Sequence, residues 1–252
     1  MSVQACAEIV QRGDPDRFAA AMAAPVDARR VLFPLYAFNI EVARAPWVTE
    51  EPMIAEMRLQ WWRDALEEIA ERRHVRRHEV TTPLAEVLPV SSAEILDQLI
   101  AARRWDIYKE AFEDSDHFAE YLKKTGGSLM WAAADALGAH HTARETVEAF
   151  GQSTALSRFL RAAPALENAG RIPLVDGTLE GISNEVRRAL EGLPSRSTLK
   201  TMLPELAFAA VLEGWQTDPL LNQIAQNPTR VADGTIGLSE FRRRSRLIRW
   251  AL

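Results

Sequence analysis

The sequence predicts an all-α protein, and three observations lead to that prediction. Ala, Leu, Glu and Arg are abundant while runs of β-branched residues are few, a composition that favours helices. Along most of the chain, apolar residues recur at spacings of three and four. No long linker rich in Pro, Gly or Ser divides the 252 residues. We therefore expect a single helical domain over residues 1–252, long enough to bury a substantial core.

Charge, cysteine content and hydropathy narrow the function classes. The formal net charge is -5, whereas a general nucleic-acid binder would carry a basic excess along one face, so we expect no nucleic acid as a partner. Cys6 is the single cysteine and excludes an internal disulfide. Residues 1–14 lack a secretory signal, and the most apolar windows, 129–139 and 206–212, are too short for a membrane span of about 20 residues. We expect a cytoplasmic protein in a reducing compartment.

The first third of the chain predicts three helices. Asp14 and Pro15 begin the first, which ends near residue 24. The second runs over residues 30–45, and the third begins at Pro52 and is expected to be mostly buried, because its apolar residues form two adjacent stripes. These stripes are Ile54, Met57, Trp61 and Ala65, and Leu59, Trp62, Leu66 and Ile69.

A dense basic run follows at residues 72–78. His74 and His78 have the spacing of two metal ligands on a helix, but the four arginines of the run would repel a cation. We therefore expect a solvated loop or a surface that contacts anions.

Small residues interrupt the helical pattern of residues 116–138, which follows a helix predicted to start at residue 91 or 92. The interruption is Thr125-Gly126-Gly127-Ser128, and it predicts a kink or the close approach of another backbone or a ligand. Gly138 is expected to cap this helix. A further helix runs from residue 142, and Pro164 is expected to end or kink it.

The last third predicts helices at residues 198–215 and 219–226, and a terminal helix with two faces. Phe241, Ile248 and Leu252 share one stripe, and the opposite side carries Arg242, Arg243, Arg246 and Arg249. Two interpretations remain open: the apolar stripe docks the helix onto the protein, or the arginine face contacts anionic lipid or an acidic partner at the inner face of a membrane.

Several landmarks, in order over residues 15–190, resemble those of the squalene/phytoene synthase family. They are Tyr36-Ala37-Phe38, Trp61-Trp62-Arg63, Tyr121 with Gly126-Gly127-Ser128, Leu160-Arg161, Gly170-Arg171-Ile172-Pro173-Leu174 and Asp176. The resemblance implies an isoprenoid-synthase-like helical bundle around a central cavity, in which two acidic motifs on facing helices hold magnesium ions that bind a prenyl diphosphate.

The positions of those acidic motifs are not acidic in this sequence. Aligned through Tyr36, the first motif falls on Ala43, Arg44 and Trp47, and the second falls on Arg158, Ala162 and Leu166. Two positive unit charges on an ion about 4 Å from an arginine cost about 8 kcal/mol at an effective dielectric constant of 20. We therefore expect magnesium binding to be lost, with no metal and no other cofactor.

The resemblance also implies candidate residues for a cavity that binds a diphosphate-like ligand. These are Tyr36, Glu41, Arg44, Tyr121, Arg158, Arg161 and Arg171. We expect Glu41 to pair with Arg44 rather than to bind a metal. The other arginines either bind a phosphate directly or form buried salt bridges in place of the metals. Ile40 and Met130 replace residues that the synthases keep as arginine and as a small residue, so we expect a narrower cavity.

The runs 38–43 and 57–62 are similar to a non-catalytic branch of the family, which includes a mitochondrial assembly factor for respiratory complex I. That resemblance implies a pseudoenzyme, a scaffold that binds complex I subunits or assembly intermediates and holds a lipid or isoprenoid ligand. One alternative is a prenyl transferase with an arginine-based diphosphate site. Another is a lipid carrier without a role in assembly.

Overall fold

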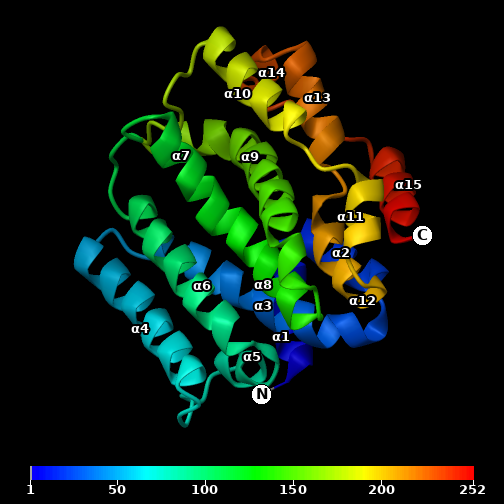
Figure 1. Cartoon of the computed structure of the whole chain (residues 1–252). Coiled ribbons are helices and arrows are strands. Elements are labelled where there is room, and N and C mark those ends of the chain that lie inside the picture. Colours follow the sequence, from blue (N-terminus) through cyan, green and yellow to red (C-terminus); the bar gives the residue numbers. More distant parts are fainter. Residues whose placement is uncertain (1) are drawn as a thin grey trace.

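The computed structural model describes residues 2–252, and these residues form helices and no strand (Figure 1). The all-α prediction is confirmed. The longer helices are α1 (Val3–Gly13), α2 (Pro15–Ala23), α3 (Val26–Arg44), α4 (Pro52–Ala70), α5 (Thr81–Val87), α6 (Val90–Ala102), α7 (Ser115–Leu122), α8 (Ser128–Ala136), α9 (Arg144–Asn168), α10 (Leu179–Glu191), α11 (Arg196–Met202), α13 (Thr217–Gln226) and α15 (Glu240–Ala251). Shorter turns are α12 (Glu205–Phe208), α14 (Thr229–Ala232), the 3-10 segments η1 (Ala45–Trp47), η2 (Arg103–Asp106), η4 (His141–Ala143) and η5 (Ala209–Gly214), and the π-helical turn η3 (Lys123–Gly127).

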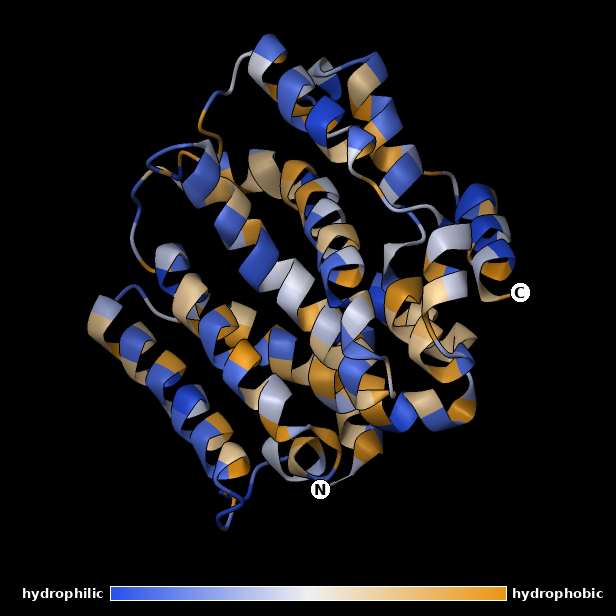
Figure 2. Ribbon diagram, in the orientation of Figure 1, coloured by the Kyte–Doolittle hydropathy of each residue, from blue (hydrophilic) through white to orange (hydrophobic). Residues whose placement is uncertain are grey.

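Buried apolar side chains form two clusters, and the long helix α9 contributes to both. Val147 and Phe150 of α9 belong to the larger cluster, which also takes residues from α1, α3, α4, α6 and α8. Leu156 and Leu160 belong to the smaller cluster with residues of α7, α10 and α13. In Figure 1, α9 runs beside α7 and α8, with α4 and α6 on one side and α10, α13 and α15 on the other. Figure 2 shows α10 and α15 as largely hydrophilic and the segment that contains α12 as largely hydrophobic.

Three glycines let the backbones of η3 and α9 touch. A Cβ atom at Gly126 would lie 2.4 Å from the Cβ of Ala155, and one at Gly127 would lie 2.8 Å from the carbonyl oxygen of Glu148. A Cβ at Gly151 of α9 would likewise lie 2.8 Å from the carbonyl oxygen of Gly126. The predicted close approach at residues 125–128 is therefore confirmed, and its partner is the backbone of α9. Gly138 adopts a φ of 89° directly after α8, as expected for a helix cap.

Helix boundaries differ from the prediction at two prolines. The helix expected over residues 198–215 is broken, because Leu203 precedes Pro204 and adopts φ -106° and ψ 136°, an extended conformation that residues before proline prefer. Pro164, by contrast, does not end α9, which continues to Asn168. The basic run lies largely outside the helices, with residues 73–78 irregular, so His74 and His78 do not share a helix face.

Two amphipathic helices expose apolar residues, which the sequence placed inside for α4 and left open for α15. Met53, Ile54 and Met57 of α4 are exposed, so the first half of that helix is less buried than predicted. In α15, the stripe of Phe241, Ile248 and Leu252 is exposed, and the interpretation that it docks the helix is wrong. The following sections return to α15, because its arginines explain this orientation.

Candidate functional site

A cavity of about 310 Å³ lies between α3 and α9. Its lining includes Ala43 of α3 and Trp47 of η1 on one side, with Arg158, Ala162 and Leu166 of α9 on the other. The structure thus brings together five of the six positions on which the acidic motifs fall. Arg44, the sixth, lies outside this lining with an exposed side chain. Gly126 and Gly151, the residues of the close backbone contact, also line the cavity.

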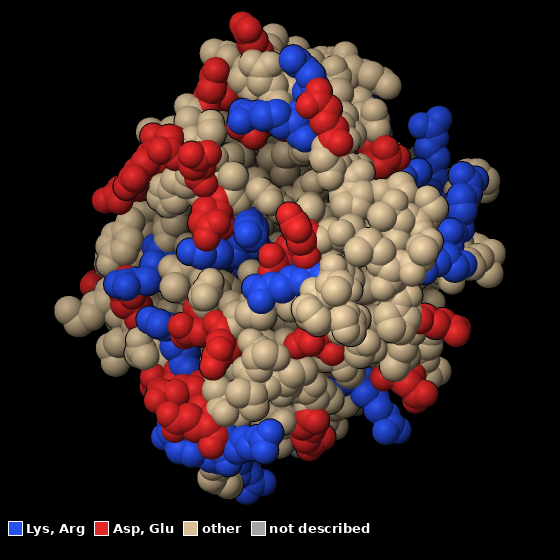
Figure 3. Space-filling view, viewed as in Figure 1, with Lys and Arg blue, Asp and Glu red and all other residues tan. Residues whose placement is uncertain are grey.

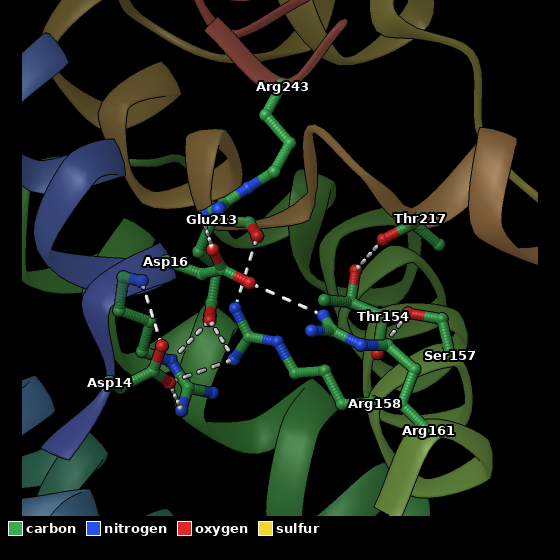
Figure 4. Close-up of polar contacts among 10 residues, drawn as sticks. Asp14, Asp16, Thr154, Ser157, Arg158, Arg161, Glu213, Thr217 and Arg243 are labelled. Carbon is green, nitrogen blue, oxygen red and sulfur yellow. Dashed lines mark hydrogen bonds and ion pairs between the residues drawn. The ribbon is translucent and has the colours of Figure 1, made fainter. Parts of the chain in front are cut away.

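Arg17, Arg158 and Glu213 line the cavity and, with Asp14 beside them, form what we call the long-range cluster (Figure 4). The Glu213 side chain is 1% exposed and accepts hydrogen bonds from Arg17 Nε and, at 3.0 Å, from Arg158 Nη1. Asp14 Oδ2 lies 3.0 Å from Arg17 Nη1 and 3.7 Å from Arg158 Nη1. Two guanidiniums and two carboxylates from α2, its N-cap, α9 and η5 therefore neutralise one another.

Burial and neighbouring opposite charges shift the pKa values of Asp14 and Arg17 in opposite directions. Burial disfavours the ionised form of Asp14, but the charges of Arg158 and Arg17 outweigh it, so the pKa of Asp14 lies below its usual value. Burial also disfavours the charged form of Arg17, and the nearby carboxylates of Glu213 and Asp14 still raise its pKa. The charged forms of Asp14 and Arg17 are therefore both favoured at neutral pH.

Tyr36 packs against Arg17 of the long-range cluster. Its ring is 5.5 Å from the guanidinium carbon of Arg17, and its side chain is fully buried. Within residues 2–252 its hydroxyl has no hydrogen-bond partner. Burial, and then the charge of Glu213, raise the pKa of Tyr36 well above its usual value, which keeps the phenol protonated.

A second group of lining residues, Arg103, Asp106 and Tyr121, forms what we call the short-range cluster. The Tyr121 hydroxyl donates to Asp106 Oδ1 at 3.0 Å and accepts from Arg103 Nη1 at 2.8 Å. Arg103 Nη1 also lies 3.1 Å from Asp106 Oδ2. Burial raises the pKa of Tyr121 far above its usual value. This cluster closes a loop between η2 and α7.

Arg171 contacts the backbone of the segment that carries Asp106 of the short-range cluster, and it does not line the cavity. Its guanidinium donates to the backbone carbonyls of Trp105, Asp106 and Tyr108, and it lies over the rings of Trp47 and Trp105 at 5.0 and 5.5 Å. Burial lowers the pKa of Arg171. Its donors are used by the protein itself, which favours the structural interpretation of this arginine.

The remaining predicted residues lie in other grooves. Glu41 Oε1 is 3.9 Å from Arg44 Nη1, the expected pair, and both line a groove of about 460 Å³ beside Trp61, Trp62 and His78. Arg161 contacts Asp16 at 3.3 Å in a third groove. Met130 is fully buried outside the cavity lining, so it does not itself narrow the cavity. Ligand binding by the predicted residues stays a prediction.

The residues around the cavity do not fit a magnesium site. Mg²⁺ requires carboxylate oxygens in near-octahedral geometry. The facing positions Ala43, Ala162 and Leu166 supply no ligand atom, and the lining carboxylates, Asp106 and Glu213, are engaged by arginines in separate clusters. Among residues 2–252, no three His, Cys, Asp or Glu side chains are grouped so that they could hold a metal ion.

Sequence reasoning missed most partners of the predicted arginine and tyrosine. Arg17, Glu213, Arg103 and Asp106 were not predicted as site residues, and Asp14 was noted only as a helix start. Glu213 did carry a signal, since it is a lone charge after the apolar window of residues 206–212. Arg103 and Asp106 had no such signal, because charged residues flank many predicted helix ends.

The fold is that of the isoprenoid synthases. Over 98% of this chain and 94% of the other, the structure matches a dehydrosqualene synthase solved in complex with a ligand, with a TM-score of 0.79 and 15% sequence identity. A squalene synthase from Alicyclobacillus acidocaldarius matches with a TM-score of 0.71 and 14% identity, over 90% of this chain and 94% of that one. The chain belongs to the squalene/phytoene synthase family, whose family model matches residues 10–232.

Proteins that are similar in sequence are named as assembly factors rather than as synthases. The Drosophila melanogaster homolog of NADH dehydrogenase (ubiquinone) complex I assembly factor 6 is 29% identical over 190 residues, which are 71% of this chain and 57% of the relative. The Bos taurus and Homo sapiens proteins named assembly factor 6 are 24% and 23% identical over 199 residues, 71% of this chain and 55% of each relative. The chain thus spans a little more than half the length of these relatives.

Proposed function

We propose that this protein is a non-catalytic member of the squalene/phytoene synthase family that acts as a scaffold in the assembly of respiratory complex I. Its partners are complex I subunits or assembly intermediates, and its cavity holds a lipid or isoprenoid ligand. It works in the cytoplasm in peripheral contact with the inner face of the membrane.

The observation that carries the non-catalytic part is the charge pairing inside the cavity. Prenyl transfer needs a cation-lined site in which the leaving diphosphate is neutralised as it departs. At the positions expected to hold the metals, this cavity has alkyl and indole side chains, and Arg158 is bound to Glu213 at 3.0 Å. A diphosphate would have to compete with buried carboxylates for Arg17 and Arg158, which disfavours its binding.

The assembly part rests on the relatives. Assembly factor 6 proteins from Drosophila melanogaster, Bos taurus and Homo sapiens match 71% of this chain in sequence, a similarity that goes beyond the fold. The cavity supports an apolar occupant, because Leu122, Phe159 and Leu166 line it and its volume is near the lower end of the range for small-molecule sites. No helix among residues 2–252 is both long and apolar enough to cross a membrane.

Deleting the gene tests the assembly role. We expect less assembled complex I and slower NADH-linked respiration in membranes, while succinate-linked respiration, which bypasses complex I, is unchanged. Expression of the wild-type chain should restore both measurements. Unchanged complex I level and activity in the deletion strain would refute the assembly role.

Incubating the purified protein with farnesyl or geranylgeranyl diphosphate and magnesium tests the absence of catalysis. We expect no release of diphosphate, and no rise in melting temperature on addition of Mg²⁺, because a ligand that binds only the folded state would raise it. Turnover that Arg158→Ala abolishes and Arg144→Ala leaves intact would instead establish a prenyl transferase with an arginine-based site, because Arg158 lines the cavity. Arg144 is a matched control because it lies on the same helix and outside the cavity lining.

A further inference from the structure

Helix α15 is held to the protein by three side chains on one face. Arg243 contacts Asp16, Arg246 donates to the carbonyl oxygen of Trp215 and lies 2.8 Å from Asp218, and Trp250 is buried against Phe150 with ring centroids 5.5 Å apart. The backbone carbonyl of Trp250 also accepts from Arg196. Two arginines and an indole therefore make the docking face, and the orientation of the helix is fixed.

The opposite face of α15 is apolar in its centre and cationic at both edges. Phe241, Ile248 and Leu252 are 80%, 60% and 81% exposed. At 100° per residue, these three side chains fall within one narrow stripe, with exposed Arg244 on one edge and exposed Arg242 and Arg249 on the other. Lys200 lies beside the end of the helix, where it donates to the carbonyl oxygen of Leu252. Large apolar side chains with this exposure, bordered by cations, are typical of helices that lie in a membrane interface.

A groove of about 420 Å³ between α13 and α15 runs along one edge of this stripe. Arg242 and Arg249 line it, and so does the carboxylate of Asp218, which is paired with Arg246 at 2.8 Å and accepts from the amide of Asn222. Within residues 2–252, the guanidiniums of Arg242 and Arg249 form no ion pair, in contrast to Arg243, Arg244 and Arg246. Because Arg246 neutralises the carboxylate of the groove, the two guanidiniums without an ion pair can bind the phosphate of a lipid headgroup.

We propose that the exposed face of α15 binds the surface of an anionic phospholipid membrane, with Phe241, Ile248 and Leu252 among the acyl chains and a headgroup phosphate between Arg242 and Arg249. This inference specifies the membrane contact that is part of the proposed function. It rests on the proposed function only for the place where the protein acts. The inference specifies which surface of the protein contacts the membrane and which class of lipid it binds. It can be tested on the purified chain alone.

Charge favours a lipid surface over other occupants. The whole chain carries -5, so an anionic membrane repels most of its surface, whereas α15 has five arginines and one glutamate. At the right edge of Figure 3, basic side chains over α15 alternate with uncharged atoms that project outward. A second copy of this face would bring like charges together, which disfavours self-association.

Co-sedimentation of the purified chain with vesicles tests the proposal. We expect binding to phosphatidylglycerol/phosphatidylcholine vesicles, weak binding to pure phosphatidylcholine, and loss of binding at high salt. F241S/I248S/L252S should lower the partition coefficient on the order of 100-fold, because three exposed apolar side chains lose their place in the acyl region. R242Q/R249Q should lower it on the order of 20-fold, since each cation near an anionic surface contributes about 1 kcal/mol.

Two matched variants control for nonspecific adsorption to the vesicles. M53S/M57S removes exposed apolar residues of α4, and R72Q/R77Q removes exposed arginines of the other basic run; both should bind like the wild type. All of these side chains are exposed, so the variants should fold, which circular dichroism checks. Absence of wild-type binding to anionic vesicles, or losses in the control variants equal to those in the α15 variants, would overturn the proposal. Loss of a dimer in the α15 triple variant, with vesicle binding intact, would overturn it in favour of self-association.

A fluorescent label gives an independent measure of depth. Ser245 lies on the exposed face, three and four residues from Ile248 and Phe241. Cys6 is buried and its pKa is raised to about 12 by burial, so a maleimide dye would react with Ser245→Cys and leave Cys6 unlabelled. We expect a blue shift of the dye with anionic vesicles and none for Met57→Cys. An unshifted spectrum at Ser245→Cys would place this face in water and contradict the proposal.

Discussion

The two charged clusters that line the cavity differ in which parts of the chain they connect, although each joins arginine to carboxylate. The long-range cluster links residues that are 196 positions apart, from Arg17 of α2 to Glu213 of η5, and α9 contributes Arg158 between them. The short-range cluster joins Arg103, Asp106 and Tyr121, which lie within 18 positions of one another. The first therefore ties separate parts of the fold together, while the second shapes one connection.

The comparison teaches which charges determine the tertiary structure around the cavity. Forming the long-range cluster desolvates four ionised groups, and its energy is recovered only when α2, α9 and η5 are all in place. The short-range cluster includes a neutral phenol and forms within one local segment. Removing Glu213, the buried carboxylate that Arg17 and Arg158 share, should consequently cost more than removing a partner in the short-range cluster.

Glu213→Gln should have the largest effect. It leaves Arg17 and Arg158 with a buried positive excess, and we expect a loss of about 3 kcal/mol in the free energy of unfolding. Chemical denaturation measures it, with Glu240→Gln as the control: Glu240 also pairs with two arginines but is exposed, so its loss should stay below about 1 kcal/mol. Equal losses in the two variants would remove the basis of the comparison.

Tyr121→Phe should have an intermediate effect. It removes the hydroxyl between Arg103 and Asp106 while their direct contact remains, and we expect a loss of about 1 to 2 kcal/mol. Tyr108→Phe is the matched control, because its hydroxyl donates to Glu56 at an exposed position. If Tyr121→Phe proved more destabilising than Glu213→Gln, the short-range cluster would be the one that holds the fold.

Asp14→Asn should have the smallest effect at neutral pH and a distinctive dependence on pH. The folded-state pKa of Asp14 is lowered, so its carboxylate stabilises the fold above the unfolded-state pKa, near 4, and this stabilisation is lost as pH falls through the lower folded-state value. The difference in stability between wild type and Asp14→Asn should therefore be constant at neutral pH and shrink in acid.

Asp114→Asn controls for helix capping in that experiment. Both aspartates accept a hydrogen bond from the backbone three residues on, and asparagine keeps this cap. Asp114 forms no ion pair among residues 2–252. Its substitution should therefore leave the pH dependence of the free energy of unfolding unchanged in acid. Parallel profiles for both variants would show that charge at Asp14 contributes nothing.

The fold class followed from local helical patterns in the sequence, whereas the walls of the cavity followed from the resemblance to the family. Helical spacing identified α3 and α9, and the family motifs aligned Ala43 and Ala162 so that both line one cavity. The glycine run at residues 125–128 predicted a close contact because only backbone without a Cβ tolerates one. These inferences depend on residues near one another in the chain.

Long-range partners and docking faces could not be derived in the same way. Arg17 and Arg158 were paired by Glu213, a residue that only the tertiary structure brings near. In α15 the hydropathy pattern left two orientations open, and the apolar stripe turns outward because Arg243 and Arg246 contact Asp16 and Asp218 on the protein. Amphipathicity shows that a helix has two faces, and the charges of its neighbours decide which face turns inward.

The contact of η3 with α9 makes part of the cavity wall out of backbone. Gly126 and Gly151 have no side chains to rotate aside, and a single methyl group at either position would collide with the neighbouring helix. This part of the wall therefore cannot open by a change of side-chain rotamer, and the cavity can widen there only if the backbones of η3 and α9 move apart.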